Sequence, residues 1–350
     1  MSAGSALGNP PLVLAVLNMS SPTVPSRLVP ATREPPTSSF VTPLLTDMYQ
    51  LSMAYAYWKG GRADVPSVFD MFFRVPPFGG EFTVFCGLEE VIRFIQVYTF
   101  TPTQLAYVRT LLPHAEEGFW TYLANLDCSE VRVYAIAEGS VVFPRVPLLR
   151  VEGPLGIVQL LETTLLNLCN FASLVCTNAV RHRLVAGPNK TLLEFGLRRA
   201  QGSDGGMSAT HYSYVGGFDG TSNVAAGMAF GMRPSGTMAH SLVCAYAGFD
   251  DLKSHELNGV DIVAASVRYL KELGFPHVNG GETAAFIAFS QAFSGNFIAL
   301  VDTYDTLNSG VPNFIAVALA LRDAGFAAKG LRLDSGDLAY LSREARKMLE

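Results

Sequence analysis

Two pairs of carboxylates follow short apolar runs in the second half of the sequence. Asp302 and Asp305 form one pair, and Asp334 and Asp337 form the other, beside Arg332. Carboxylate oxygens suit Mg²⁺, which keeps several waters and takes one or two protein carboxylates beside substrate phosphates. An Asp after a strand also commonly caps the next helix. Because two such pairs recur next to an arginine, the pattern favours a shared magnesium and phosphate site over capping alone.

Three arginines and one histidine add groups for anion binding and phosphoryl chemistry. Arg198, Arg199 and Arg332 each end or follow an apolar run, where a guanidinium can hold a carboxylate or phosphate through paired hydrogen bonds. His240 lies three residues after Thr237 in a small-residue segment, and an imidazole there can act as a nucleophile or proton shuttle. Solvated arginines and a structural histidine are the alternative interpretation, which the spacing leaves open.

Several well-known catalytic motifs are missing from the sequence. It contains no G-x-x-x-x-G-K-[ST] loop, no G-x-G-x-x-G at a strand-to-helix turn, no H-E-x-x-H and no G-x-S-x-G. These absences argue against a P-loop enzyme, a standard dinucleotide site, a dedicated zinc site and a serine hydrolase. The residues alone therefore indicate an enzyme that handles a phosphorylated, anionic small molecule with Mg²⁺.

Composition narrows the class of protein further. The chain has 350 residues, of which 49% are hydrophobic and only 16% charged, with a formal net charge of −5. A globular chain usually carries ~25% charged residues, so this chain is expected to bury much apolar surface, in about two domains. Its mildly acidic net charge does not indicate a nucleic-acid-binding protein. Five Cys without a C-x-x-C pair favour a reduced, cytosolic protein, and the polar residues within 157–180 favour a buried helix over a membrane span.

The order of the predicted elements indicates how these residues are positioned. Residues 1–38 lack a sustained period and are expected to be a flexible leader. Strands first mixed with helices and then clustered predict an α+β or sandwich-like first domain over 39–155. After a long helix near 157–186, short apolar runs such as 297–301 and 329–333 alternate with helical patterns, which predicts parallel βα units, in a barrel or a doubly wound sheet, over 156–350. In such barrels the chemistry collects at the C-terminal ends of the strands, where the charged clusters fall.

Eight segments in order resemble nicotinate phosphoribosyltransferase, a type II phosphoribosyltransferase family of NAD synthesis. The resemblance extends from about residue 40 to the end of the chain. The segments are Leu44–Trp58, Phe72–Gly80, Gln159–Thr163, Glu194–Gly206, Tyr212–Asn223, Gly236–Ser241, Val301–Asp305 and Leu331–Leu338.

The resemblance implies an N-terminal α/β-sandwich domain, a βα (TIM-like) barrel that is incomplete at the C-terminus, and a reaction. Phosphoribosyl pyrophosphate would transfer its phosphoribosyl group to nicotinate, giving nicotinate mononucleotide and pyrophosphate, with Mg²⁺ as cofactor. ATP hydrolysis would be coupled through a phosphohistidine, and His240 stands at that position. Asp302 and Asp334 look like the residues that face the ribose and Mg²⁺.

The resemblance also implies binding residues and an assembly. Tyr49, Thr237 and Arg332 match family positions that contact nicotinate, and Arg198 looks like the arginine near the pyridine and the phosphates. Because Tyr49 would complete the neighbouring subunit's site, a cytosolic homodimer is expected.

One departure from the family concerns the C-terminus. Members run well past 350 residues, and a 5-phosphate-binding loop with a Thr does not appear here. An unclosed barrel would expose a strand edge, so the polypeptide alone is expected to aggregate or to show little catalytic turnover. The alternatives are a transferase that uses nicotinamide or quinolinate, and a weak or inactive form that dimerises with a full-length enzyme.

Overall fold

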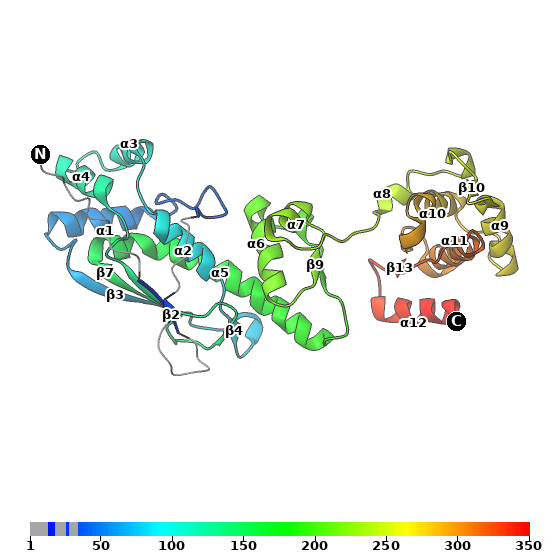
Figure 1. Cartoon of the computed structure of the whole chain (residues 1–350), viewed down its shortest axis with the longest axis horizontal. Coiled ribbons are helices and arrows are strands. Elements are labelled where there is room, and N and C mark those ends of the chain that lie inside the picture. The colour runs from blue at the N-terminus through cyan, green and yellow to red at the C-terminus, as the bar shows by residue number, and fades with distance from the viewer. Residues whose placement is uncertain (1–12, 18–25, 28–33) are drawn as a thin grey trace, which may run out of the picture. The chain divides into compact units, whose positions relative to one another are not determined.

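The computed structural model of the chain describes residues 13–17, 26–27 and 34–350. Helices and strands are interspersed along these residues, so the fold is α/β, as the sequence predicts. The chain divides into two compact units, one up to Ser235 and one from Gly236 to Glu350. Each unit has helices and strands of its own, drawn in Figure 1, and contains a hydrophobic core of its own.

The first unit is built on a five-stranded mixed sheet with the strand order β2-β1-β5-β7-β3. β7 pairs antiparallel with both β3 and β5, while β1 lies parallel to β5. A separate antiparallel pair joins β4 to β6. The strands are β1 Val13–Leu17, β2 Ser26–Arg27, β3 Pro66–Met71, β4 Thr83–Val84, β5 Arg132–Ile136, β6 Val141–Val142 and β7 Leu149–Pro154.

The segment predicted as a leader contributes to this unit. The apolar run of β1 pairs its backbone with β5 and so extends the sheet. Further along, the Thr37 amide and hydroxyl donate to the two carboxylate oxygens of Glu90, at 2.9 and 2.6 Å. Ser38 Oγ donates to Asp204 at 2.6 Å. The predicted leader thus includes segments that are hydrogen-bonded to the first unit. Its residues 1–12, 18–25 and 28–33 lie outside the described residues.

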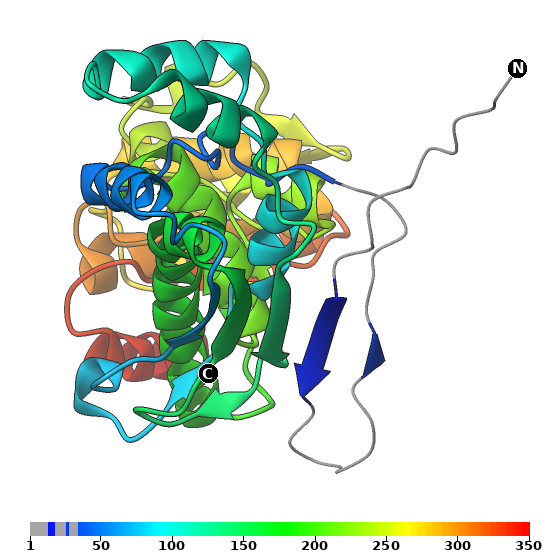
Figure 2. The same ribbon diagram turned by 90° about the vertical axis from the view of Figure 1, so that its left-hand side faces the viewer.

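Helix α5, Leu155–Ala186, organises the first unit. It contacts β3 and β7 of the sheet and the helices α1, α2 and α6, and Figure 2 shows it in green beside the strands. Phe85, Phe94, Phe119 and Leu149 are fully buried in the core that these elements enclose. The other helices before it are α1 Met48–Lys59, α2 Leu88–Val97, α3 Pro102–Leu111 and α4 Glu117–Asn125, with a 3₁₀ turn at Pro77–Gly79.

Within the described part of the chain, α5 is also the one helix long and apolar enough to cross a membrane by length and composition. Half of its most apolar window is buried inside the unit. Its buried polar side chains have partners: Gln159 donates to Gln50 at 2.5 Å, and Thr164 donates to the Leu45 carbonyl at 2.7 Å. These are the contacts of a core helix, which the sequence predicts.

The remainder of the first unit surrounds a short parallel pair, β8 Leu193–Glu194 and β9 Gly220–Thr221. Glu194 accepts hydrogen bonds from Thr210 at 2.7 Å and Thr221 at 2.9 Å, so its carboxylate fastens α6 to the strand pair. The other elements of this part are the 3₁₀ turn Leu197–Arg199, α6 Gly202–Val215 and α7 Val224–Phe230.

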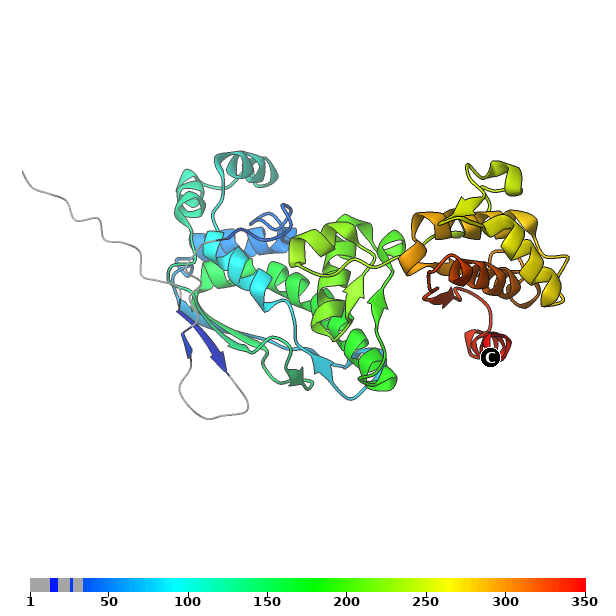
Figure 3. The same ribbon diagram turned by 45° about the vertical axis from the view of Figure 1, so that its right-hand side comes forward.

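The second unit packs helices α9, α10 and α11 on one another next to the parallel pair β12 and β13 (Figure 3). Phe286, Phe297 and Phe314 meet in its core with ring centroids 5.8 to 6.4 Å apart. The elements are α8 His240–Val243, β10 Glu256–Leu257, β11 Val260–Asp261, α9 Ile262–Glu272, α10 Gly280–Ala292, β12 Ile298–Leu300, the π-helix η5 Thr306–Gly310, α11 Val311–Asp323, β13 Gly330–Arg332 and α12 Leu338–Leu349. Two 3₁₀ turns complete the unit, η3 Phe249–Asp251 and η4 Ser294–Asn296.

The predicted strands 297–301 and 329–333 are present as β12 and β13, and they pair parallel as expected. The sequence pattern does not predict the helices α4 and α10. The predicted domain ranges 39–155 and 156–350 stay predictions. The division into two compact units falls at Ser235. Among the described residues no sheet closes on itself, because the strands beyond residue 190 form separate two-stranded pairs.

Candidate functional site

The candidate site lies at the carboxyl ends of β12 and β13. These strands pair parallel with Leu300 opposite Arg332, so the residues that follow each strand emerge at the same edge. Asp302 follows one strand and Asp334 follows the other. Strand register therefore brings together two segments that are 32 residues apart in sequence.

Asp302 links the two strand ends. Its Oδ2 accepts hydrogen bonds from the Asp334 amide at 3.1 Å and from the Ser335 hydroxyl at 2.6 Å. Its Oδ1 is buried and has no hydrogen-bond partner. A buried carboxylate oxygen without a partner is costly unless a ligand completes it, so this atom is the first mark of a binding site.

The two carboxylate pairs divide their roles. Asp305 caps η5, accepting from the amides of Leu307 at 3.2 Å and Asn308 at 2.9 Å. Hydrogen bonds from the Asn308 side chain and these amides lower the pKa of Asp305. Asp337 caps α12 through the Tyr340 amide at 3.0 Å. The second Asp of each pair thus begins a helix, and the first is left for the site.

Arg332 lies inside the site on β13. Its Nη1 donates to Thr237 Oγ1 at 2.9 Å, and its Nη2 is 3.9 Å from Asp334 Oδ2. Its Nε is buried without a partner. A guanidinium with a free buried N–H retains capacity to bind an anion, and the role of this arginine stays a prediction.

His240 begins the short helix α8 and faces both strand ends. Its Nδ1 is 3.1 Å from Thr303 Oγ1, and its Nε2 is 3.5 Å from Asp334 Oδ2. The ring is therefore held on both nitrogens while its side chain stays 42% exposed, so it is accessible to a substrate. The sequence predicted His240 but not Thr303, whose only signal was its place directly after Asp302.

A buried carboxyl on α10 is hydrogen-bonded to η5 and α11, the two helices that follow β12. Glu282 Oε2 accepts from Ser309 at 2.6 Å and from Asn313 at 3.0 Å, while Oε1 is buried without a partner. Burial is the main cause that raises the pKa of Glu282, and Asp305 and Asp302 raise it further. The sequence analysis missed Glu282, although Asn279 three residues before it is a typical N-cap signal and does cap α10.

Five predicted site residues therefore lie together in the second unit: Thr237, His240, Asp302, Arg332 and Asp334. The other two lie in the first unit. Tyr49 is 48% exposed on α1 and donates to Glu162 at 3.2 Å, and Arg198 is exposed in the 3₁₀ turn after β8.

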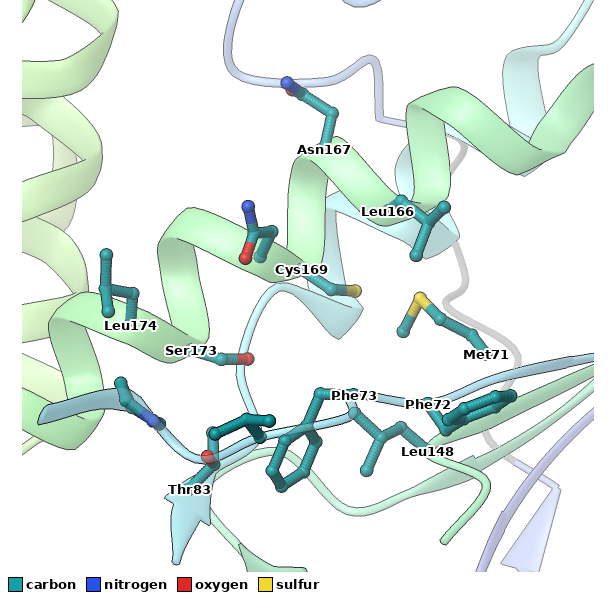
Figure 4. Close-up of a pocket in the computed structure, with 13 residues that line it drawn as sticks. Met71, Phe72, Phe73, Thr83, Leu148, Leu166, Asn167, Cys169, Ser173 and Leu174 are labelled. Carbon is teal, nitrogen blue, oxygen red and sulfur yellow. The ribbon is translucent and has the colours of Figure 1, made fainter. Parts of the chain in front are cut away.

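The first unit also has an apolar cavity of about 360 Å³ that contains none of the predicted site residues. Figure 4 shows α5 on one side of it and residues of the sheet region on the other. Its lining includes Met71, Phe72, Phe73, Leu148, Leu166 and Leu174, with Thr83, Asn167, Asn170 and Ser173 as polar members.

The fold and the site together define an α/β protein that gathers carboxylates, an arginine and a histidine at parallel strand ends. Residues 44–170 match the nicotinate phosphoribosyltransferase (NAPRTase) N-terminal domain. Nicotinate phosphoribosyltransferase from Dictyostelium discoideum is 56% identical over 320 residues, covering 90% of this chain and 54% of that protein. The human enzyme is 47% identical over 332 residues, covering 91% of this chain and 62% of that protein.

Solved structures agree with these sequence matches. The crystal structure of human nicotinic acid phosphoribosyltransferase matches with a TM-score of 0.78 over 86% of this chain and 63% of that one. Nicotinate-nucleotide pyrophosphorylase from Pyrococcus furiosus, at 22% identity, shares the fold with a TM-score of 0.58 over 88% of this chain and 62% of that chain. Over about nine-tenths of its length the chain matches nicotinate phosphoribosyltransferases at 46% to 56% identity, and it spans between 54% and 62% of the length of these curated relatives.

Proposed function

We propose that this chain carries the reaction site of a nicotinate phosphoribosyltransferase. Phosphoribosyl pyrophosphate would transfer its phosphoribosyl group to the pyridine nitrogen of nicotinate, giving nicotinate mononucleotide and pyrophosphate. The observation that carries the proposal is the cluster at the ends of β12 and β13, in which Asp302 Oδ1 and Arg332 Nε are buried and unpaired. The similarity to these relatives supplies the substrates, because the relatives are named for them.

The residues of the cluster have complementary tasks in such a reaction. Positive charge develops on the ribose as pyrophosphate leaves, so the carboxylate of Asp302 would stabilise that charge electrostatically. The guanidinium of Arg332, fixed by its hydrogen bond to Thr237, would bind the carboxylate of nicotinate or a phosphate. The neutral amide of nicotinamide offers this cation no charge, which is why we prefer nicotinate as the substrate.

The donor atoms in the cluster fit Mg²⁺. Asp302 provides a free carboxylate oxygen, and Asp334 lies beside it in the next strand end. The described residues hold no group of three or more His, Cys, Asp or Glu that could hold a metal. Mg²⁺ tolerates such a sparse site because substrate phosphates and water complete its shell. When bound, the ion would neutralise charge on the departing pyrophosphate.

ATP would act through His240 in this proposal. Its side chain is 42% exposed, and its Nδ1 is 3.1 Å from Thr303 Oγ1 while its Nε2 is 3.5 Å from Asp334 Oδ2, which suits a phosphoryl acceptor. A phosphorylated His240 would add ~−2 charge beside the donor site and strengthen an Mg²⁺-bridged grip on the donor.

The proposal extends to the fold and the assembly. We infer a βα barrel for the catalytic region and a sandwich for the N-terminal domain, by family resemblance. Tyr49 and Arg198 are exposed in the first unit, which is consistent with a homodimer in which Tyr49 completes the partner's site. A cytosolic location fits cysteines that are all unpaired among the described residues.

A substrate comparison tests the proposal. The purified chain is incubated with phosphoribosyl pyrophosphate, Mg²⁺ and ATP, and with nicotinate, nicotinamide or quinolinate in turn. We expect slow formation of nicotinate mononucleotide from nicotinate alone, and loss of ATP stimulation in His240→Asn. Product from nicotinamide or quinolinate at an equal rate contradicts the substrate assignment. ³²P labelling from ATP that persists in His240→Asn contradicts the role of the histidine.

A further inference from the structure

His240 is positioned by a residue that the proposed function does not use. We propose that Thr303 is a positioning residue that holds the ring of His240 so that Nδ1, rather than Nε2, accepts the phosphoryl group. The inference rests on the proposed function, in which ATP phosphorylates His240.

The contacts of the ring decide which nitrogen carries a proton. A neutral imidazole has one N–H and one nitrogen with a free lone pair. Nε2 is 3.5 Å from the carboxylate oxygen Oδ2 of Asp334, an acceptor that can only favour a proton on that nitrogen. Nδ1 is 3.1 Å from Thr303 Oγ1, a hydroxyl that can donate. The consistent arrangement has the proton on Nε2, and Nδ1 accepts a hydrogen bond from Thr303 through its lone pair.

Thr303 is fixed by the structure around it. Asp302 before it is fastened to the neighbouring strand end by two hydrogen bonds. Asp305 after it caps η5. A Cβ on Gly310, the last residue of η5, would overlap the Val301 carbonyl, so η5 packs directly against the end of β12. The Thr303 hydroxyl therefore meets His240 from a segment that is held at both ends.

This arrangement gives a balanced phosphoryl transfer. The lone pair of Nδ1 forms the new N–P bond to the γ-phosphorus of ATP, and the bond from that phosphorus to the β,γ-bridging oxygen breaks. ADP leaves with the electron pair of that bond. The proton stays on Nε2, so the phosphorylated ring is positive and lies against the Asp334 carboxylate. The Thr303 hydroxyl, released from Nδ1, can donate to an oxygen of the new phosphoryl group.

Thr303→Val and Thr303→Ser form a matched pair for the test, because valine keeps the shape and loses the hydroxyl while serine keeps the hydroxyl. Spectra of the full chain labelled with ¹⁵N-histidine, without ATP, are assigned with His240→Asn. We expect the proton of His240 on Nε2, and a shift of the Nδ1 resonance in Thr303→Val that is absent in Thr303→Ser. A proton on Nδ1, or an unmoved resonance in Thr303→Val, overturns the inference.

Labelling with [γ-³²P]ATP provides the second readout. We expect phosphate on Nδ1 of His240, roughly tenfold slower labelling in Thr303→Val, and wild-type labelling in Thr303→Ser. Label on Nε2, or a wild-type rate in Thr303→Val, overturns the inference and leaves the proposed function intact. A wild-type chain without any label on His240 overturns the proposed phosphohistidine itself, and the nitrogen spectra then decide the tautomer independently.

Discussion

The two units of the chain differ in which buried polar atoms lack a partner. Among the described residues, those of the first unit are all neutral hydroxyls, and those of the second unit all belong to ionisable side chains. The former are Thr46, Thr83, Tyr98 and Tyr122, and the latter are Glu282, Asp302 and Arg332. An unpaired hydroxyl costs little compared with an unpaired buried charge, so the second unit carries the stronger sign of an incomplete binding site.

Carboxylates in the first unit show the contrast directly. Glu138 is partly buried, which raises its pKa, but it accepts hydrogen bonds from the amides of Gly87 and Glu89 at the start of α2. Glu194 likewise fastens two hydroxyls around β8. These groups hold elements together, whereas Asp302 holds two strand ends with one oxygen and leaves the other free.

The largest expected effect comes from Asp302→Asn. The amide oxygen can still accept from Asp334 and Ser335, so the fold should persist, while the charge that faces the ribose is lost. We expect turnover to nicotinate mononucleotide to fall by roughly 10²–10³-fold. Asp305→Asn is the control, because Asp305 caps a helix. Comparing the initial rates of the two variants distinguishes the roles of Asp302 and Asp305. An equal loss of turnover in both variants would contradict the assignment of Asp302 to the site and of Asp305 to the helix cap.

Arg332→Lys should have the next largest effect. Lysine keeps the positive charge but loses the paired geometry and the Thr237 contact. A hydrogen bond to a charged group contributes about 1.5–3 kcal/mol, which predicts a KM for nicotinate raised roughly tenfold or more. Arg322→Lys, at a surface ion pair 65% exposed, serves as the control. An unchanged KM in Arg332→Lys would show that the free Nε meets no substrate.

Asp337→Ala should affect stability rather than binding. Its side chain accepts the Tyr340 amide at the start of α12, and loss of an N-cap costs about 1 kcal/mol. Urea unfolding followed by circular dichroism should show this decrease in the free energy of unfolding. A large loss of substrate affinity in the same variant would mean that Asp337 belongs to the site after all.

Glu282→Gln should produce the smallest effect, visible as a change in pH dependence. The pKa of Glu282 is raised above 4.5 by burial, so the folded state binds this proton more tightly than the unfolded state does. The stability that it contributes is complete below the unfolded pKa and is lost as pH rises through the folded pKa. Glutamine cannot ionise, so the Tm of the variant minus that of the wild type should increase as pH rises. A difference that stays constant would place the charge of Glu282 in contact with a compensating cation.

The site residues at the two strand ends could be predicted from the sequence, because an apolar run that ends in Asp is a pattern of neighbouring residues. Apolar runs that end in Asp located β12 and β13, and their parallel pairing brought Asp302 and Asp334 together. The pattern could not tell which Asp of each pair caps a helix, since both lie within four residues of the helix start. Only the hydrogen bonds of Asp305 and Asp337 decide it.

Other parts of the site depend on contacts that no local pattern encodes. Gly280 and Gly281 disfavour a helix, so α10 and its buried Glu282 escaped prediction. Gly281 is required there because a Cβ would overlap the Tyr246 carbonyl, a contact between segments 35 residues apart. Thr303 gains its importance only from the position of His240 across the strand ends.

Binding of phosphoribosyl pyrophosphate tests the central claim most directly. Isothermal titration of the donor with Mg²⁺ into the wild-type chain, Asp302→Asn and Asp337→Asn compares a site residue with a helix cap in one assay. The account predicts that Asp337→Asn binds as the wild type does and that Asp302→Asn binds at least roughly tenfold more weakly. Equal affinity in all three proteins would contradict the assignment of the site to the ends of β12 and β13.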